Sequence, residues 1–465
     1  MKSHLYTVFL LLCVTSGVLA QESGSEEEQG LLRPGVLRAE ENNLYLKDHA
    51  PKGLFEHLKY IPLGNQSFLS FGGHLRQQYE YFRNFDFGEV SDDPNGWLIQ
   101  RLMLHSDLRV GNFRLFAQLQ SSHHWFETVE SLTIDRDDLA LHQGFLEYKF
   151  KWRSEASVTT RFGRQELSYG DQRLFTLRNG PNVRQTFDVA KIFYEDAQWR
   201  MDVFYARPIE NRLEVFDNPR ITNEEVWAAY SVFNTVPWVP GSMDVYYVGF
   251  RSRRRVYEEG IAQESRHSVG TRHWGKIGRF RFDHEFTYQF GRFGDGNLSA
   301  FAVSFDLGYQ LSEHGWQPEI GLKTEVISGD RVKRDGDLNT FSGLYPNGAY
   351  YGLIALFGPA NLIDFHPSVT MRPFRNYLLI LDWDFFWRYD RQDGIYAPNG
   401  SLLRAGDASD ERYYGHQPGF EMLHEVGRYW EFAFEGSWFV AGDFFADTGE
   451  ERNVLHFAIT SKFKF

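Results

Sequence analysis

The chain is 465 residues long and carries a formal net charge of −13 at pH 7, an acidic balance that argues against nucleic acid as a partner. Aromatic residues make up 17% of it, and 42 glycines stand beside only 16 prolines. After the first twenty residues, no stretch approaches the roughly 18 consecutive apolar residues that a membrane-spanning helix needs. A helical membrane protein is therefore excluded, and the many aromatic residues need another explanation.

The first twenty residues are typical of a secretory signal peptide. A positive charge precedes a short apolar run at 8–14, and Ala20 places a small residue at the expected cleavage site. The single cysteine, Cys13, lies inside this run, so the mature chain is predicted to have no disulfide and no thiol chemistry. We divide the chain into a signal peptide at 1–20, a periplasmic tail or lead-in at 21–66, and one domain at 67–465.

From residue 68 onward, apolar and polar residues alternate over long segments, which indicates β-strands with one apolar and one polar face. In residues 279–291, for example, Phe286, Tyr288 and Phe290 alternate with polar residues. Several segments are 11–14 residues long, whereas strands in soluble proteins are most often about 5–6. We predict about eighteen strands, at 69–82, 97–110, 113–122, 139–150, 157–167, 187–195, 199–208, 224–233, 242–252, 264–275, 279–291, 298–311, 317–328, 362–372, 376–388, 418–427, 430–441 and 453–465.

The connections between these segments are alternately short and long, a pattern typical of outer-membrane barrels. The alternative is a soluble β-sandwich, which would have shorter strands and would bury its apolar faces. Rows of Phe, Trp, Tyr and Leu on one face, with Arg, Asp, Glu and Gln on the other, fit lipid outside and water inside. We therefore predict an all-β fold, a transmembrane antiparallel up-and-down β-barrel of about 18 strands. It is expected in the bacterial outer membrane, in contact with lipid and lipopolysaccharide.

The inward polar faces of such a barrel form its functional surface, because about eighteen strands leave an aqueous interior. Basic residues are frequent in the first seven strands and carboxylates in the later ones. A wall of arginines can bind carboxylates weakly at several places, which suits passive diffusion of anionic solutes. Alternatively, these charges pair across strands and only stiffen the barrel. The predicted basic lumen residues include Arg76, Arg101, Arg109, Arg114, Arg161, Arg200, Arg281, Lys323, Arg372 and Arg388, and the acidic ones include Glu80, Asp107, Asp202, Asp283 and Glu285.

Several stretches resemble the alginate export porin family. The most specific is "RFGRQELSYGDQRLF" at 161–175, and the resemblance covers roughly residues 35–465. It implies an eighteen-stranded outer-membrane barrel that passes a polyuronate through an electropositive constriction. Other similar stretches lie at 58–82, 182–192, 199–208, 268–291 and 325–352. Carried onto matching positions, the resemblance implicates Arg76, Arg101, Arg161, Arg164, Arg184 and Arg272 in binding an anionic carbohydrate.

Three details qualify this resemblance. Arg161 and Arg164 cannot both point inward in a regular strand, so a bulge at Gly163 is expected to re-aim one of them. The acidic second half of the lumen departs from the family pattern, which leaves a general porin, or one specific for another substrate, as the alternative. The last strand ends on Phe465 and resembles the signal read by the outer-membrane assembly machinery, which is therefore an expected partner.

Other functions have weaker support. His123 and His124, in an expected loop, could bind a metal, and the aspartates of 135–138 and 329–337 could hold Ca²⁺, but neither aspartate group matches a full EF-hand pattern. We predict no metal site and no cofactor. A lipase or deacylase barrel would need a convergent Ser, His and acid, and no such motif is present. A structural or adhesive barrel with a plugged lumen remains open, because three predicted loops are long.

Overall fold

The computed structural model describes most of the expected domain and part of the segment before it. The predicted signal peptide, with Cys13, and the acidic stretch that follows it lie outside the described residues. Among the described residues, no helix is long and apolar enough to cross a membrane. The described ranges are 36–48, 53–64, 66–89, 95–125, 133–153, 155–237 and 239–465.

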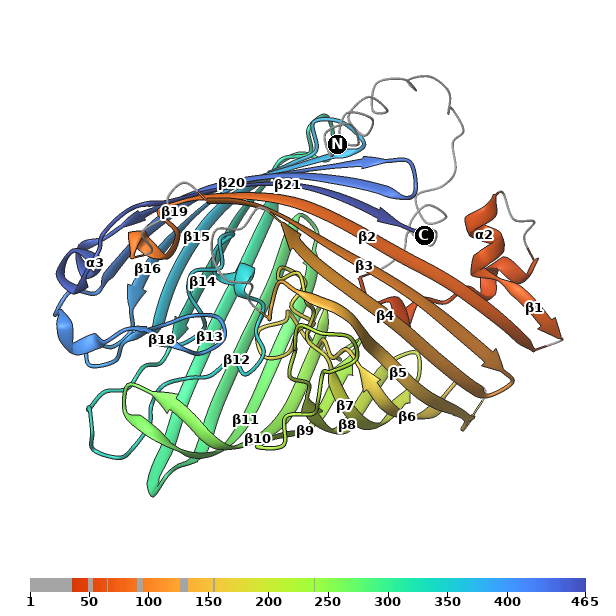
Figure 1. The fold of residues 1–465 in the computed structure, drawn as a ribbon, viewed down its shortest axis with the longest axis horizontal. Coiled ribbons are helices and arrows are strands. Elements are labelled where there is room, and N and C mark those ends of the chain that lie inside the picture. The colour runs from red at the N-terminus through yellow and green to blue at the C-terminus, as the bar shows by residue number, and fades with distance from the viewer. Residues whose placement is uncertain are drawn as a thin grey trace, which may run out of the picture.

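Eighteen antiparallel strands form a closed barrel (Figure 1). Consecutive strands pair with each other, and β21 pairs with β2 with Ile459 opposite Tyr79, so the wall has no free edge. The predicted fold class and strand number are confirmed. The strands are β2 (Ser67–Arg83), β3 (Asn95–Val110), β4 (Phe113–Trp125), β5 (Asp137–Lys151), β6 (Ser157–Gln165), β7 (Phe187–Glu195), β8 (Trp199–Pro208), β9 (Glu224–Phe233), β10 (Ser242–Tyr257), β11 (Gly260–Ile277), β12 (Phe280–Phe293), β13 (Gly296–Gln310), β14 (Glu319–Ile327), β15 (Leu362–Met371), β16 (Tyr377–Arg388), β19 (Tyr413–Val426), β20 (Trp430–Ala441) and β21 (Val454–Lys464).

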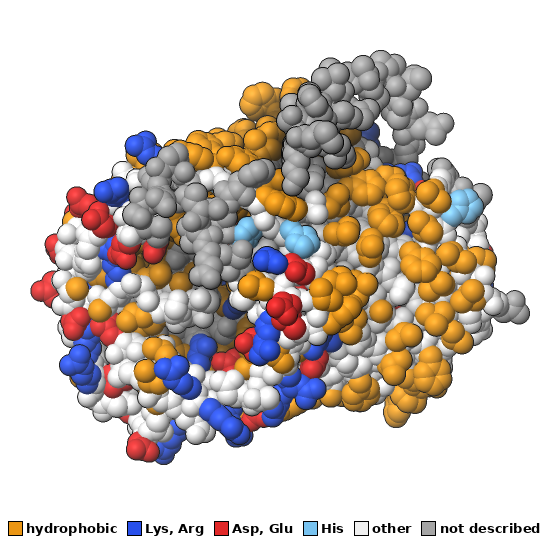
Figure 2. Space-filling view, viewed as in Figure 1, with side chains coloured by type: hydrophobic (Ala, Val, Ile, Leu, Met, Phe, Trp, Pro, Cys, Tyr) orange, Lys and Arg blue, Asp and Glu red, His pale blue; other side chains and the backbone are white. Residues whose placement is uncertain are grey.

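The outer face of the wall is apolar and much of the inner face is polar, as strand β12 illustrates. Phe286 and Phe290 are 47% and 40% exposed on the outer face, whereas Glu285 and Gln289, which precede them in the chain, are 7% and 0% exposed. Figure 2 shows hydrophobic side chains spread over the outer wall on the right of the view, with charged side chains gathered at the left. Hydrocarbon is the solvent that stabilises such a surface, because water would leave its aromatic rows unfavourably hydrated.

The two rims of the barrel differ. One, which we call the short-turn rim, joins strands by turns such as Gly111–Asn112, and there Gly111 takes a positive φ of 58° that suits glycine. Helix α2 (Leu54–Lys59) and strand β1 (Ile61–Gly64) lie at this rim (Figure 1). The other, the long-loop rim, carries the 166–186, 328–361 and 389–412 loops together with β17 (Ile395–Tyr396), β18 (Leu402–Arg404) and α3 (Asp443–Thr448). Short 3-10 helices occupy Arg38–Glu40, Leu44–Asp48, Phe85–Gly88, Gly348–Tyr351 and Gly406–Ala408.

Two buried acids join the loops of the long-loop rim. The backbone N–H of Asp330 and the hydroxyl of Thr340 donate to Oδ2 of Asp393, at 2.8 and 2.6 Å, and the hydroxyl of Tyr396 donates to its Oδ1 at 2.6 Å. Burial raises the pKa of Asp330 to about 7, with a further contribution from the charge of Asp393. Burial also raises the pKa of Asp393 to about 6. Both acids are therefore stabilised in the folded loops when they are protonated.

These raised pKa values predict that the loop assembly loosens as pH increases. A folded pKa above the unfolded value contributes stability below the unfolded pKa, which is lost as pH rises through about 6 to 7. We expect hydrogen exchange in the 389–412 loop, corrected for its intrinsic pH dependence, to be about tenfold faster at about pH 8 than at about pH 5. Asp393→Asn should reduce this difference, whereas Asp410→Asn, an exposed acid of the same loop, should keep it. Equal protection at both pH values in the wild type would contradict the assignment.

The residues considered as metal ligands have protein partners in the structure. His123 and His124 were expected in a loop, but they lie at the end of β4, and His123 pairs with Asp138 at 3.6 Å. Strand β4 extends further than the alternation predicted because these two polar residues interrupt the pattern. Asp137 accepts a hydrogen bond from Asn218 at 2.6 Å. The aspartates of 329–337 considered for Ca²⁺ also accept hydrogen bonds from the protein: Asp330 from the N–H of Arg331 at 2.9 Å and Asp337 from the N–H of Asn297 at 2.7 Å.

Candidate functional site

Residues 36–48, which we call the lumen segment, lie against the inner wall near the short-turn rim. Arg114 on β4 donates to the carbonyl of Ala39 at 2.7 Å, and Arg184 in the 166–186 loop donates to the carbonyl of Val36 at 3.3 Å. Ala39 is buried with the inward-facing Phe116 and Phe145. Guanidinium groups thus satisfy backbone carbonyls that the segment could not pair by itself.

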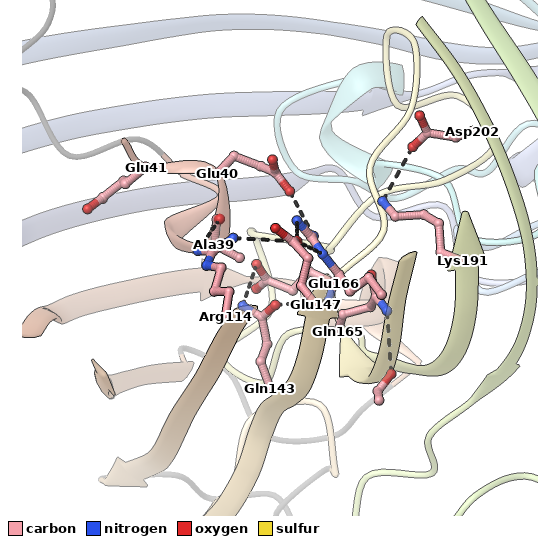
Figure 3. Close-up of polar contacts among 12 residues, drawn as sticks. Ala39, Glu40, Glu41, Arg114, Gln143, Glu147, Gln165, Glu166, Lys191 and Asp202 are labelled. Carbon is pink, nitrogen blue, oxygen red and sulfur yellow. Dashed lines mark hydrogen bonds and ion pairs between the residues drawn. The ribbon is translucent and has the colours of Figure 1, made fainter. Parts of the chain in front are cut away.

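The lumen segment places a carboxylate on a group of wall cations. Glu40 accepts a hydrogen bond from Nη1 of Arg161 on β6 at 2.9 Å. Arg161, together with Lys191 on β7 and Arg200 on β8, forms what we call the basic cluster. Figure 3 shows Glu40 reaching toward the wall, with Lys191 and its partner Asp202 on the neighbouring strands. The enclosure of Glu40 within the barrel would by itself raise its pKa, but the charges of Arg161 and then Lys191 outweigh this effect and lower that pKa to about 2.

The wall around the basic cluster carries more cations than carboxylates. Arg161 also contacts Glu147 at 2.6 Å, and Arg200 and Lys191 share Asp202 at 2.8 and 3.3 Å. Among the described wall residues of this region, the cations are Arg109, Arg114, Arg161, Lys191 and Arg200, and the carboxylates are Asp107, Glu147 and Asp202. Glu40 offsets part of this excess, and its side chain is 44% exposed, so its carboxylate borders open space.

Two cavities meet at Glu40. One of about 220 Å³ is lined by the basic cluster with Asp202, by Glu166 and Tyr169 of the 166–186 loop, and by the lumen segment. The other, of about 810 Å³, opens beside the lumen segment and helix α2. Leu37, Glu40 and Ser168 line both, so Glu40 lies where the larger cavity meets the basic cluster. A solute entering from the larger cavity would therefore encounter the same cations that hold Glu40.

Three of the predicted arginines hold the 166–186 loop inside the barrel. Arg76 on β2 donates to the carbonyls of Asn179 and Gly180, both at 2.9 Å. Arg101 on β3 donates to the Asn179 side chain at 2.8 Å, and Arg184 donates to the same oxygen at 2.7 Å. The predicted inward position of Arg76 and Arg101 agrees with the structure, but their donor groups are occupied by the loop. These two arginines therefore hold the loop inside the lumen, which the loop narrows.

The 166–186 loop meets the 328–361 loop across the lumen. The N–H of Thr176 donates to the carbonyl of Tyr345 at 2.9 Å, and the N–H of Tyr345 donates to the carbonyl of Leu174 at 3.0 Å. Arg173 then reaches the far wall, where it pairs with Glu285 at 2.6 Å and Glu325 at 3.4 Å. The acidic half of the lumen therefore supplies counterions for a loop arginine that the alternation pattern could not reveal.

Two further predicted cations of the acidic half form ion pairs within the wall, and a third contacts a loop. Arg272 on β11 pairs with Asp283, and with Asp244 at 3.3 Å. Arg281 on β12 pairs with Asp306 at 3.0 Å. Lys323 on β14 donates to the carbonyl of Tyr350 and lies 4.2 Å from that ring's centre. Arg272 and Arg281 fit the alternative in which lumen charges pair and stiffen the barrel.

Two predicted acids near β2 and β3 also have partners. Glu80 accepts hydrogen bonds from Gln78 at 2.6 Å and from the Trp97 ring nitrogen at 3.0 Å. Asp107 accepts from Arg114 at 2.7 Å and from Arg109 at 3.0 Å. Asp107 thus belongs to the basic region around Glu40, whereas Glu80 lies apart from it.

The prediction that Arg164 lines the lumen is wrong. Arg164 shares a face of β6 with Phe162, which is 57% exposed on the outer wall, and it pairs with Asp188 at 3.1 Å. The pairing with β5 runs without a register shift through Gly163, so no bulge turns Arg164 inward there. Of the two arginines in this strand, only Arg161 belongs to the lumen.

Arg372 and Arg388 were also predicted to bind solute in the lumen, but the structure places both at strand ends. Arg372 follows the end of β15 and lies exposed in a turn of the short-turn rim, where its N–H donates to the carbonyl of Trp316. Arg388 is inward-facing and fully buried, but it donates to backbone carbonyls of the 389–412 loop, including Arg391 and Gly406 at 2.9 Å. Both lie at strand ends, where alternation no longer indicates contact with solute.

Sequence reasoning missed Glu40 and Lys191. Lys191 lies on the inner face of β7 between Val189 and Phe193, while the outer face carries Ile192. Both faces of β7 are therefore largely apolar, so the alternation did not indicate which face, and with it Lys191, points into the lumen. Glu40 precedes the first barrel strand, where the pattern is weak, and no local signal shows that its segment enters the lumen.

A closed wall of eighteen strands that is apolar outside and charged inside, with loops folded into the lumen, defines an outer-membrane β-barrel of the porin type. The alginate export family model matches residues 67–457, and the chain belongs to this family. The predicted resemblance is confirmed. None of the curated proteins compared with the chain matches it.

Solved porin structures share the fold. Acinetobacter baumannii OccAB2 is similar with a TM-score of 0.55 and 10% identity, over 85% of this chain and 98% of that one. A BenF-like porin from Pseudomonas fluorescens Pf-5 has a TM-score of 0.55 and 9% identity, over 85% and 99%. Pseudomonas aeruginosa OccK11 has a TM-score of 0.53 and 11% identity, over 87% and 99%. At these identities the similarity concerns the fold alone.

Proposed function

We propose that this protein is a channel through which anionic carbohydrates of the uronate type diffuse across the outer membrane of a Gram-negative bacterium. The contact between Glu40 and Arg161 carries this proposal, because a carboxylate is held where a uronate carboxylate would bind. The cation excess of the surrounding wall and membership of the alginate export family support it. A transport role rather than an enzymatic one is consistent with this family and fold.

The basic cluster would act by exchange of carboxylates. Arg161 presents planar donors that can bind both oxygens of a carboxylate, whereas Lys191 supplies a compact charge beside it. An entering uronate would displace Glu40 and then pass to further cations, so that no single site holds it too tightly to leave. We identify no energy source, so transport would follow the concentration gradient.

Ion selectivity tests this function. The mature protein is reconstituted in a planar bilayer, and the reversal potential is measured across a KCl gradient. Because the wall carries an excess of cations, we expect a reversal potential whose sign shows preference for chloride over potassium. A potential that shows preference for potassium, or the absence of conductance, would remove the proposal.

Removal of the internal carboxylate should strengthen anion binding. Glu40→Gln leaves the wall cations in place but deletes the competing charge, so chloride preference should increase and uronate oligomers should block the current about two- to tenfold more tightly. Glu210→Gln, which changes an exposed glutamate of a loop, is the matched control and should change neither quantity. Tighter blockade in both variants, or in neither, would show that Glu40 does not compete with the solute.

A structural or adhesive barrel with a closed lumen is the second candidate. The pairing of the 166–186 and 328–361 loops across the interior favours it. Shortening the 166–186 loop distinguishes the two functions. A channel should conduct before the change and more strongly after it, whereas a plugged barrel should be silent beforehand.

A further inference from the structure

A group of metal-ligating side chains lies on the inner wall away from the basic cluster. Asp364 and His366 face the lumen from β15, two residues apart and therefore on one face. Asp384 faces them from the neighbouring strand β16. Phe365 is opposite Phe385 in the pairing of these antiparallel strands, so the same register places His366 opposite Asp384. One ligand atom from each of these three residues lies within 4.8 Å of the other two.

The carboxylates of this group have fewer partners than buried charges require. Asp364 is fully buried, and neither of its oxygens has a hydrogen-bond partner. Asp384 is also fully buried, and its oxygens are likewise without hydrogen bonds. Nδ1 of His366 lies 2.5 Å from Oδ1 of Asp384, so the imidazole is an ion-pair partner of Asp384, but both oxygens of Asp364 are left without a hydrogen bond. A buried carboxylate without a partner is costly, so Asp364 beside Asp384 calls for a further cation.

Neighbouring protein cations do not fill this need. Lys323 on β14 is opposite His366 in the register, but its ammonium donates to the carbonyl of Tyr350. Arg173 is engaged by Glu285 and Glu325. Glu325 itself stands opposite Asp364 and adds negative charge. His366 additionally faces Asp382 at 3.3 Å, so one imidazole is shared between two aspartates.

We propose that Asp364, His366 and Asp384 bind a divalent transition-metal cation, with Zn²⁺ as the best match. An imidazole nitrogen with carboxylate oxygens is a donor set that Zn²⁺ accepts, whereas Ca²⁺ and Mg²⁺ prefer oxygen ligands alone. Gln417 on β19 stands opposite Asp384, is 1% exposed, and has an amide nitrogen without a partner. Rotation of this amide would present its oxygen as a further ligand.

The proposed metal would join three strands beneath a loop. Ligands from β15 and β16, with Gln417 on β19, lie under Gly352 of the 328–361 loop. A Cβ at Gly352 would come within 2.9 Å of the Gln417 amide nitrogen and 3.5 Å of Asp384 Oδ2. The cation would therefore fix the wall where this loop crosses the lumen, and its release would loosen the loop.

Metal analysis of the purified mature protein tests the proposal. The protein is extracted in detergent, stripped with a chelator, exposed to Zn²⁺, desalted and analysed for bound zinc. We expect one Zn²⁺ per chain, and a higher melting temperature with zinc than without it. Asp364→Asn and His366→Gln should each lose at least about tenfold in zinc affinity. Asp364→Asn removes an unpaired charge and should fold, which the heat-dependent mobility of the barrel on gels confirms.

His123→Gln is the matched control, because His123 pairs with Asp138 at another position and could bind zinc adventitiously. It should bind zinc as the wild type does. Absence of stoichiometric zinc in the wild type would overturn the proposal and indicate that Asp364 and Asp384 share a proton instead. Zinc lost in His123→Gln but retained in His366→Gln would overturn it as well.

Discussion

Replacing Arg161 with Gln is expected to weaken the binding of uronate oligomers about tenfold to a hundredfold, because charge-assisted hydrogen bonds contribute about 1.5–3 kcal/mol. Arg161 contacts both Glu40 and Glu147, so it is the member of the basic cluster that holds the internal carboxylate. Glu147 keeps Arg114 at 3.8 Å after the change, and the wall should remain folded. The measurement is the oligomer concentration that blocks half of the single-channel current in a planar bilayer.

The matched control for this prediction is Arg207→Gln. Arg207 lies on β8 and pairs with Glu225 at 3.5 Å on the exposed side of the wall, so blockade should be unchanged. Arg161→Lys should retain the charge but lose the planar donors, and an intermediate affinity is expected. Equal blockade in the wild type and Arg161→Gln would show that solute does not bind at the basic cluster.

The double change of Arg76 and Arg101 to Ala is expected to raise the single-channel conductance several-fold. These arginines make six hydrogen bonds to residues 179–182 of the 166–186 loop. Within that stretch Arg184, which belongs to the loop itself, donates to the Asn179 side-chain oxygen and not to the backbone carbonyls. Each buried carbonyl left without a donor costs about 1–3 kcal/mol, so this part of the loop should leave the wall. The constriction would then widen and fluctuate.

Two measurements accompany this prediction. Conductance and current noise are recorded in a planar bilayer, and the intact barrel is treated with a protease that cleaves exposed loops. Cleavage within 166–186 should appear in the double variant and be absent in Arg251→Ala, an exposed arginine that pairs with Glu225. A loop that stays protected, with wild-type conductance, would mean that Asn182 and the partner loop hold it without these arginines.

Strand positions followed from the sequence because alternation persists wherever a strand crosses lipid. The segment predicted at 69–82 is β2 at Ser67–Arg83, and the one predicted at 430–441 is β20 with the same bounds. The errors lie beyond the membrane. Strand β10 continues to Tyr257 through a run of arginines, and β19 begins at Tyr413, five residues before the predicted start. Outside hydrocarbon, both faces of a strand contact water, so no pattern marks its end.

The candidate site was only partly accessible from sequence. Arg161 and Arg200 were found because inward cations alternate with apolar residues, but contacts between distant segments leave no local signal. Glu40 reaches Arg161 across 121 positions of the chain, and Arg173 reaches Glu285 across 112. The choice of Arg164 rested on resemblance alone, and strand parity places it outside. His366 was missed because a single histidine becomes a metal-site candidate only when Asp384 is brought beside it.

A structure determined in the presence of a short uronate oligomer tests the central claim most directly. The account predicts a solute carboxylate on Arg161, with Lys191 beside it and the Glu40 side chain displaced into the larger cavity. An oligomer bound elsewhere in the barrel, with Glu40 still on Arg161, would contradict it.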